Sequence, residues 1–194
     1  MAVELVYETH SISTDNEAGI ATGRLPGTLS PRGRDLAREL GNRRRDDGIS
    51  VVFVSDLRRA AETAEIAFED SGIPIHRDAR LRECDYGELN GMPVARLAGE
   101  RSRHIDTPWP GGQSYRQVVE QTRDFLGDLA AVWDGHRVVV ISHSANRWAL
   151  DHLLGGRELE ELVDAPFAWK EGWEYVVPTG FPADDRAAAP EGGR

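Results

Sequence analysis

Three short runs of apolar and mostly β-branched residues stand out along the chain. They are Val3–Tyr7, the run SVVFVS at Ser50–Ser55 and the run RVVVIS at Arg137–Ser142. Each run is short and nearly uniform, without the strict alternation of apolar and polar positions that marks a half-exposed strand. Strands of this kind are covered on both faces. We therefore predict three interior strands of a parallel sheet.

Helical spacing of apolar residues follows these runs. Ser30 is a candidate N-cap with Pro31 at the first helical position of one helix. Asp56 is a candidate cap for a second helix, and Ser114 opens a third with a capping box. Because strands and helices alternate, the pattern predicts an α/β sandwich with right-handed crossovers. The predicted helices are Pro31–Arg45, the segment from Asp56 to Ser71, the segment from Ser114 to Trp133, and Asn146–Leu154.

Two parts of the chain are less regular. The segment Leu81–Gly112 is rich in glycine and proline, so we expect loops around one short helix near Pro93–Leu97, lying over a functional site. Leu162–Phe167 and Trp173–Val177 form either an added strand pair or a dimer contact, and the sequence leaves both open. We predict one domain over residues 1–180 and a disordered tail over residues 181–194.

Composition narrows the classes of protein that fit. The 194 residues include 23 basic and 33 acidic side chains, and the net charge of -10 argues against a nucleic-acid binder with a basic face. A single cysteine, Cys84, excludes an intramolecular disulfide and a multi-cysteine metal site. No stretch approaches the roughly 18 apolar residues of a membrane span. We expect a soluble, cytoplasmic protein that binds neither nucleic acid nor membrane.

Candidate chemistry lies where the predicted strands end. Ligands of an open parallel sheet bind beyond the carboxyl ends of its strands. His10 follows the first run, Arg58-Arg59 follow the second and His143 follows the third, and Arg82-Glu83 from the irregular segment can join them. A neutral histidine can attack phosphorus while arginines stabilise the phosphoryl oxygens and a carboxylic acid protonates the departing alkoxide. The set therefore suits phosphoryl transfer without a metal ion.

Taken in chain order, these motifs resemble the histidine phosphatase superfamily, in its phosphoglycerate mutase-like branch. The resemblance implies a three-layer α/β/α sandwich with a mostly parallel central sheet. It also implies that His10 is the nucleophile, that Glu83 is the general acid and then base, and that Arg59, His143 and Asn16 contact the phosphate. The motifs are Thr9-His10-Ser11, SPRG at Ser30–Gly33, SDLRRAAETA at Ser55–Ala64, Leu81-Arg82-Glu83 with Tyr86-Gly87-Glu88, GQSY at Gly112–Tyr115, and Ser142-His143.

The chain departs from the family pattern at the nucleophile. The family motif is Arg-His-Gly, whereas this chain has Thr9 and Ser11 around His10, so an arginine that normally touches the phosphate is missing. Ser144 likewise stands where a glycine is usual. The arginines that are candidates to compensate are Arg24, Arg58, Arg82 and Arg147. The additional candidate contacts to substrate or phosphate are Thr9, Ser11, Arg24, Arg82 and Ser144.

We expect a metal-independent phosphomonoesterase that needs no cofactor and hydrolyses a small phosphorylated metabolite through a phosphohistidine on His10. One alternative is a phosphate-ligand binding or regulatory module with weak or no turnover, because Thr9 replaces the motif arginine. A phosphomutase is a further alternative, for which the chain lacks the room of larger family members. The expected partner is a small-molecule phosphate ester, and a homodimer stays open.

Overall fold

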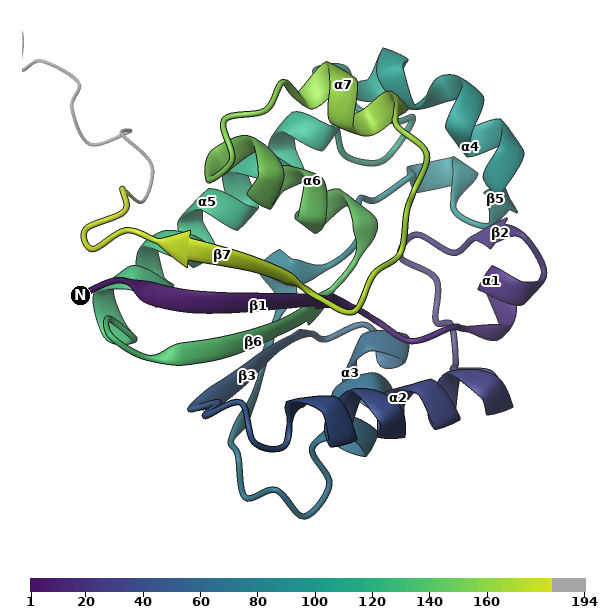
Figure 1. The fold of residues 1–194 in the computed structure, drawn as a ribbon. Coiled ribbons are helices and arrows are strands. Elements are labelled where there is room, and N and C mark those ends of the chain that lie inside the picture. Colours follow the sequence, from purple (N-terminus) through teal and green to yellow (C-terminus); the bar gives the residue numbers. More distant parts are fainter. Residues whose placement is uncertain (183–194) are drawn as a thin grey trace, which may run out of the picture.

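The computed structural model describes residues 1–182 and is built around a five-stranded sheet in the order β4-β3-β6-β1-β7 (Figure 1). Neighbouring strands run parallel, except that β7 runs antiparallel to β1 at the sheet edge. All three predicted interior strands are present in it. The strands of the sheet are β1 (Val3–Thr9), β3 (Val51–Ser55), β4 (Ile75–Asp78), β6 (Arg137–Ser142) and β7 (Trp173–Val177).

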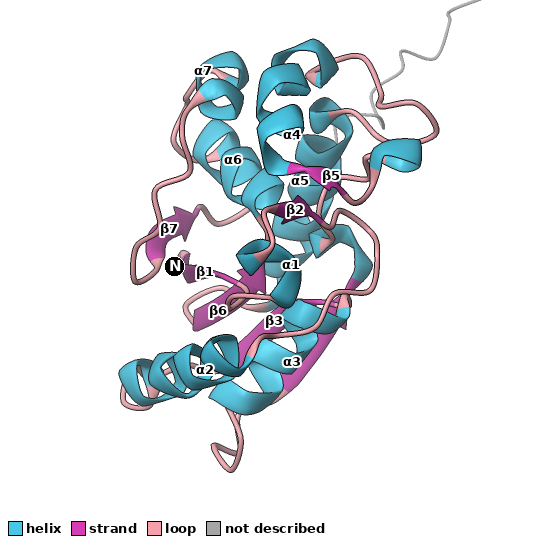
Figure 2. Ribbon diagram, turned by 90° about the vertical axis from the view of Figure 1, so that its right-hand side faces the viewer, coloured by secondary structure: helices cyan, strands magenta, loops and turns pink. Residues whose placement is uncertain are grey.

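Helices cover both faces of this sheet (Figures 1 and 2). On one face lie α2 (Pro31–Arg44) and α3 (Arg58–Ala67), which pack on each other. On the other lie α5 (Tyr115–Val132) and α6 (Ser144–Leu153), with α7 (Leu159–Asp164) packed on α6. The architecture is the three-layer α/β/α sandwich with a mostly parallel central sheet that the sequence predicts.

A small cap lies at the end of the molecule towards which the parallel strands point (Figure 1). Its two-stranded sheet pairs β2 (Ile20–Ala21) with β5 (Met92–Pro93). The loops predicted over residues 81–112 belong to this cap, which places them over the carboxyl ends of the strands as expected. Its helices are α1 (Thr14–Glu17), α4 (Val94–Glu100) and the short 3-10 helices η2 (Gly87–Leu89) and η3 (Arg101–His104), whereas the 3-10 helix η1 (Ala79–Leu81) packs on α5 and β3.

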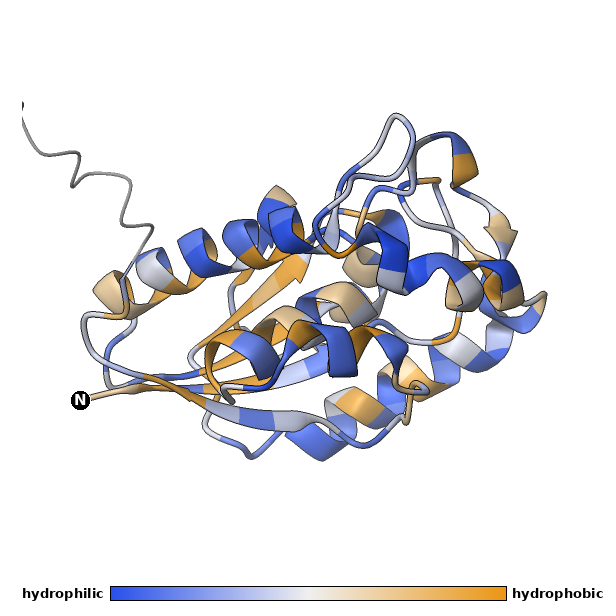
Figure 3. Ribbon diagram, turned by 90° about the horizontal axis from the view of Figure 1, so that it is seen from above, coloured by the Kyte–Doolittle hydropathy of each residue, from blue (hydrophilic) through white to orange (hydrophobic). Residues whose placement is uncertain are grey.

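The core explains why the strand sequences are apolar throughout. In β6, Val138 and Val140 face α5 and α6, while Val139 and Ile141 face α2 and α3. All four side chains are at most 1% exposed. Each buried side chain of this size stabilises the fold by about 1.5–3 kcal/mol. In Figure 3 hydrophobic colour is accordingly concentrated on strands inside the fold, and the helices mix hydrophilic with hydrophobic residues.

One of the two alternatives for the C-terminal apolar segments is wrong. Trp173–Val177 is a strand, but Leu162–Phe167 does not pair with it, because Leu159–Asp164 forms the helix α7. Leu159, Leu162 and Val163 lie at helical spacing and are buried. The dimer contact stays a prediction.

Two further local expectations need correction. Asp56 does not cap α3, because its carboxylate accepts hydrogen bonds from Arg82, with Nε to Oδ1 at 2.6 Å. The cap position is held by Leu57, which has no side-chain acceptor. The edge strand β4 (Ile75–Asp78) goes unpredicted because its sequence, IHRD, has a single apolar residue.

No helix within residues 1–182 is long and apolar enough to cross a membrane. Of the tail predicted over residues 181–194, positions 183–194 lie outside the described residues.

Candidate active site

His10 extends the strand that carries it. Its backbone amide donates to the carbonyl oxygen of Ser142 at 2.9 Å, which continues the pairing of β1 with β6 by one residue. Its Nδ1 lies 2.8 Å from the carbonyl oxygen of Ser11. A carbonyl can only accept, so Nδ1 carries the proton and Nε2 carries the lone pair. His10 therefore presents Nε2 as its nucleophilic atom.

The loop after His10 is held by the helix layer below it. The amide of Ser11 donates to Thr63 Oγ1 on α3 at 3.0 Å. The amide of Ser30 donates to the carbonyl of Ile12 at 3.0 Å, just before α2 begins. A Cβ at Gly33 would lie 1.9 Å from that same carbonyl. Only glycine permits this close approach, which explains the last residue of the SPRG motif.

Arg59 lies in the first turn of α3 and joins the two histidines. Its Nε donates to His10 Nε2 at 3.2 Å, and its Nη2 lies 3.3 Å from His143 Nδ1. The side chain is buried, with 2% of the residue exposed. Among residues 1–182 no carboxylate forms an ion pair with it, and burial lowers its pKa. Within the described residues, the hydrogen-bond partners of this buried cation are two imidazoles and two backbone carbonyls, all of them neutral.

The loop above Arg59 requires a glycine. The carbonyl of Gly23 accepts from Arg59 Nη2 at 2.9 Å, and that of Leu25 accepts from Nη1 at 3.4 Å. Gly23 has a φ of 55°, and a Cβ there would lie 1.9 Å from Asn90 Oδ1 and 2.8 Å from the Tyr86 ring. A side chain at position 23 would therefore push the loop away from the guanidinium.

His143 lies at the N-terminus of α6, with its ring 5.0 Å from that of His10. Arginine only donates, so Nδ1 of His143 accepts from Arg59, and its Nε2 donates to Ser55 Oγ at 2.9 Å. The hydroxyl of Tyr7 donates to the backbone carbonyl of His143. Burial and the charge of Arg59 lower the pKa of His10 to about 3 and hold the pKa of His143 well below its usual range. Both imidazoles are neutral at neutral pH.

Glu83 comes from the loop between η1 and η2 and is 9% exposed. Its Oε1 accepts from the amide of Cys84 at 2.8 Å. Burial raises the pKa of Glu83, against hydrogen bonds from the amides of Cys84 and Ala145 and the charges of Arg59 and Arg24. A raised pKa favours the protonated form of the carboxyl, which can donate its proton.

Some of the remaining candidate residues lie beside His10 or Glu83, and others are held by partners of their own or are exposed. Arg24 reaches the loop of Glu83, since its Nε donates to the carbonyl of Glu83 at 2.7 Å, and Thr9 and Ser11 flank His10. Arg82 is instead held by Asp56, and the amide oxygen of Asn16 accepts from the amide and hydroxyl of Ser13. Of the other candidates, Ser144 is the half-buried first residue of α6, Arg58 is exposed, and Arg147 pairs with Asp151 at 2.6 Å.

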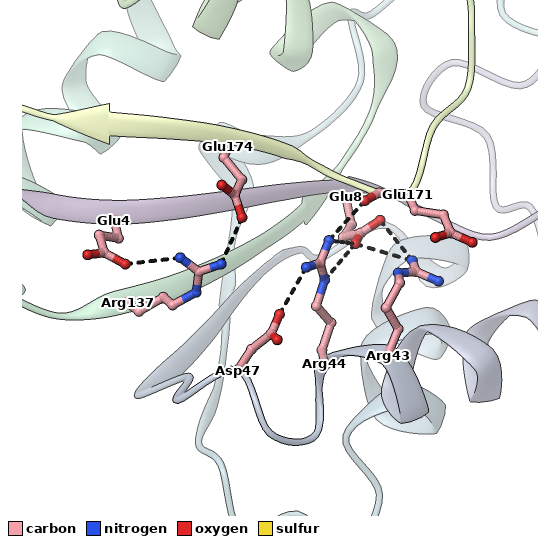
Figure 4. A network of polar contacts seen from close by, with 8 residues as sticks. All are labelled: Glu4, Glu8, Arg43, Arg44, Asp47, Arg137, Glu171 and Glu174. Atoms are coloured by element: carbon pink, nitrogen blue, oxygen red, sulfur yellow. Dashed lines mark hydrogen bonds and ion pairs between the residues drawn. The ribbon is translucent and has the colours of Figure 1, made fainter.

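A buried ion-pair network lies between β1 and α2 (Figure 4). Strand alternation turns Glu8 towards α2, where its Oε1 accepts from Arg44 Nη2 at 2.7 Å and Nε at 2.9 Å. Arg43 approaches the same oxygen at 3.3 Å. Arg44 also donates to Asp47 at 2.9 Å and to the carbonyl of Glu171 at 3.1 Å. The network ties the end of β1, two residues before the nucleophile, to α2 and to the segment that leads into β7.

Several supporting residues escape sequence reasoning. Ser55 orients His143, Thr63 holds the amide of Ser11, and Gln113 accepts from Arg24 Nη2 at 2.7 Å. The first two lie inside the SDLRRAAETA motif and Gln113 inside GQSY, so the motifs themselves are the available signal. In the part of the chain that the structure describes, no three or more His, Cys, Asp or Glu side chains cluster to hold a metal ion.

A family model described as histidine phosphatase superfamily (branch 1) matches residues 9–168. A curated 2,3-bisphosphoglycerate-dependent phosphoglycerate mutase of Parvibaculum lavamentivorans is 34% identical over 155 residues, covering 72% of this chain and 73% of the relative. Another, of Afipia carboxidovorans, is 30% identical over 179 residues, covering 84% and 86%.

Solved structures share the fold. Bacillus stearothermophilus YhfR has a TM-score of 0.78 at 23% identity, over 87% of this chain and 88% of that chain. The mycobacterial glucosyl-3-phosphoglycerate phosphatase complexed with VO3 has a TM-score of 0.73 at 26% identity, over 82% and 85%. Because the family model spans most of the sequence and similar chains share both sequence and fold, this chain belongs to the histidine phosphatase superfamily, branch 1.

Proposed function

We propose that the chain is a metal-independent phosphomonoesterase that forms a phosphohistidine on His10. One observation carries the proposal: Arg59, a buried arginine without a carboxylate partner in residues 1–182, lies between Nε2 of His10 and Nδ1 of His143. A buried cation costs several kcal/mol of desolvation unless an anion compensates it. A phosphate dianion bound here compensates Arg59 and lies directly beside the nucleophile.

In the first step, the lone pair of His10 Nε2 attacks phosphorus and the P–O bond to the alcohol breaks. The departing oxygen takes the proton of Glu83, whose raised pKa keeps that proton available. Arg59 stabilises the charge on the non-bridging oxygens during the transfer. The proton stays on His10 Nδ1, which donates to the carbonyl of Ser11, and this hydrogen bond fixes the ring in the reactive orientation.

In the second step, the Glu83 carboxylate accepts a proton from water while the water oxygen attacks the phosphohistidine. The P–N bond breaks, its electron pair returns to His10 Nε2, and inorganic phosphate leaves. Glu83 regains its proton and the enzyme is restored. The neutral state of His10 is what allows both attack and departure.

A phosphomutase is the second candidate, because both curated relatives reported above are named phosphoglycerate mutases. A chain of this size has room for a mutase, since the Afipia relative that carries this name aligns over 86% of its own length with 84% of this chain. A mutase returns the phosphoryl group to a second hydroxyl instead of to water. The phosphatase is the simpler reaction for the described site, and the glucosyl-3-phosphoglycerate phosphatase that shares this fold has that activity in its name.

The first experiment compares the wild type with His10→Ala in the hydrolysis of 4-nitrophenyl phosphate, with chelator present and no added metal. Chelator-resistant turnover that falls at least ~10³-fold in the variant supports the phosphohistidine route. Full activity in folded His10→Ala would overturn it. Adding 3-phosphoglycerate with 2,3-bisphosphoglycerate and following 2-phosphoglycerate separates the mutase from the phosphatase.

The phosphate-binding module without turnover is tested by Thr9→Arg. If the wild type binds inorganic phosphate but does not hydrolyse esters, and the variant begins to hydrolyse them, the module is the better description. If the variant loses a robust native activity, the site is built around Thr9 and the phosphatase stands.

A further inference from the structure

A phosphate dianion carries two negative charges, whereas the groups around His10 supply one full positive charge from Arg59. Both histidines are neutral, and Glu83 is a carboxyl group that repels phosphate when ionised. Position 9, where the family motif has arginine, is Thr9. Arg59 alone therefore supplies one positive charge fewer than is needed to balance a phosphate dianion.

The other arginines near this end of the sheet are already paired or face solvent. Arg82 is neutralised by Asp56, with Nε to Oδ1 at 2.6 Å, and Arg147 is neutralised by Asp151 at 2.6 Å. Arg58 is exposed. None of the three offers an unneutralised charge to the site.

Arg24 differs from all three. Its partners are oxygens without a formal charge: Nε donates to the carbonyl of Glu83 at 2.7 Å, and Nη2 donates to the side-chain amide oxygen of Gln113 at 2.7 Å. Asp85 is close enough to act on its charge, but Oδ1 of Asp85 accepts from the amide of Gly87 and from Asn90 Nδ2. Within residues 1–182 Arg24 forms no ion pair, although it is half-buried.

Arg24 is bound to the loop that carries Glu83. Its Nε donates to the backbone carbonyl of Glu83, the residue proposed to protonate the departing oxygen. It follows Gly23, whose carbonyl holds Arg59. The charge of Arg24 also lowers the pKa of both Glu83 and His143, so it acts on the groups that surround the phosphoryl position.

We infer that Arg24 is the second cation of the phosphate site and binds the non-bridging oxygens of the transferred phosphoryl group, with Gln113 as the neutral support that leaves its charge free. This inference rests on the proposed function for the identity of the ligand. In this arrangement Arg24, on the connection between β2 and α2, binds the phosphate in place of the motif arginine, whose position is occupied by Thr9.

The test measures binding of inorganic phosphate, which has no leaving group, by isothermal titration calorimetry. Loss of one charged hydrogen-bonding partner corresponds to about 1.5–3 kcal/mol, so Arg24→Ala should weaken phosphate binding by roughly 10- to 150-fold. Arg58→Ala, a matched removal of an exposed arginine, should stay within about twofold of the wild type.

Two variants guard against a loop that merely collapses. Gln113→Glu keeps Arg24 and its hydrogen bond but supplies a neutralising carboxylate, and should weaken phosphate binding roughly tenfold. Thr9→Arg in the Arg24→Ala background restores a cation beside His10 and should recover at least ~10-fold of the lost affinity. Rescue by charge is a result that a purely structural role of Arg24 does not produce.

Phosphate affinity within twofold of the wild type in both Arg24→Ala and Gln113→Glu would overturn the inference. So would a loss confined to 3-phosphoglycerate, because Arg24 would then serve a second anionic group on the leaving alcohol. If wild-type turnover does not depend on His10 while phosphate binding still depends on Arg24, the proposed function is wrong and the inference that Arg24 binds phosphate is supported. If turnover depends on His10 and phosphate binding ignores Arg24, the reverse holds.

Discussion

Two buried arginines of the same helix layer, Arg44 on α2 and Arg59 on α3, have opposite surroundings. Arg44 is 8% exposed and is surrounded by the carboxylates of Glu8 and Asp47, which raise its pKa. Arg59 is 2% exposed and meets two neutral imidazoles and two carbonyls, and its pKa is lowered. A compensated buried charge stabilises the fold, whereas an uncompensated one leaves binding energy for an anion from outside.

The largest effect is expected from Arg59→Met. It should lower kcat/KM for 4-nitrophenyl phosphate by about 10³-fold, or ~4 kcal/mol, because the site loses its central cation. The same variant should unfold at or above the wild-type temperature, because it removes an uncompensated buried charge. Parallel kinetics and differential scanning calorimetry check both halves. A strong fall in Tm would mean that Arg59 is as structural as Arg44.

Glu8→Gln should do the opposite, since it leaves Arg44 without its main partner. Removing one member of a buried pair costs about 3–5 kcal/mol, and the remaining contact with Asp47 places the expected loss near ~3 kcal/mol. Urea unfolding measures it. Glu4→Gln is the matched control on the same strand, because the Glu4 side chain is 62% exposed in its pair with Arg137, and it should cost less than about 1 kcal/mol. Equal losses in the two variants would remove the distinction between buried and exposed pairs.

Glu83→Gln is expected to act on chemistry that depends on the leaving group. Turnover of an alkyl phosphate should fall about 10²-fold, whereas 4-nitrophenyl phosphate, whose phenolate leaves without a proton, should fall much less. Because the pKa of Glu83 is raised and the protonated form is the active acid, wild-type kcat for the alkyl ester should fall as pH rises through that pKa. The variant should lose this alkaline limb. A similar loss for both esters would remove Glu83 as the general acid.

The same pH profile tests the nucleophile. Because the pKa of His10 is lowered to about 3, protonation of His10 should produce no acid limb until the pH approaches that value. An acid limb near pH 6.5 that is retained by every variant with an intact His10 would show that His10 is an ordinary, solvated imidazole.

The smallest effect is expected from Arg38→Ala. Arg38 pairs with Asp35 on the exposed side of α2, and their side chains are 61% and 73% exposed. Removing such a pair should change the free energy of unfolding by less than about 0.5 kcal/mol. The variant calibrates the comparison, since a larger change would mean that exposed arginines of this chain also carry structure.

Much of the scaffold follows from local sequence. The uniform runs SVVFVS and RVVVIS predict β3 and β6, and the capping residues Ser30 and Ser114 predict where α2 and α5 begin. The strand β4 and the helix α7 escape, because IHRD lacks an apolar pattern and because α7 is short enough to resemble a strand. The fate of Asp56 escapes for another reason, since its partner Arg82 lies 26 positions away.

The site is predictable in part. The rule that ligands bind where parallel strands end brings His10, Arg59 and His143 to one place, and the structure puts them in contact. Glu83 enters through its motif, since nothing in its loop marks it locally. The distinction among Arg24, Arg82 and Arg147 depends on which carboxylates each one meets, and those partners come from other loops and helices. The local sequence around each arginine does not contain that information.

The place of β1 in the sheet determines when the site can form during synthesis of the chain. The strand β1 is synthesised before its partners β6 and β7, and Glu4 is synthesised before its partner Arg137, which lies 133 positions later. At about 5–20 residues per second, synthesis of the intervening segment takes on the order of ten seconds. During that interval the strand β6, whose Ser142 binds the backbone of His10, has not been synthesised, so His10 is not yet positioned. A nascent chain halted before β6 is therefore expected to bind no phosphate, whatever it has already folded.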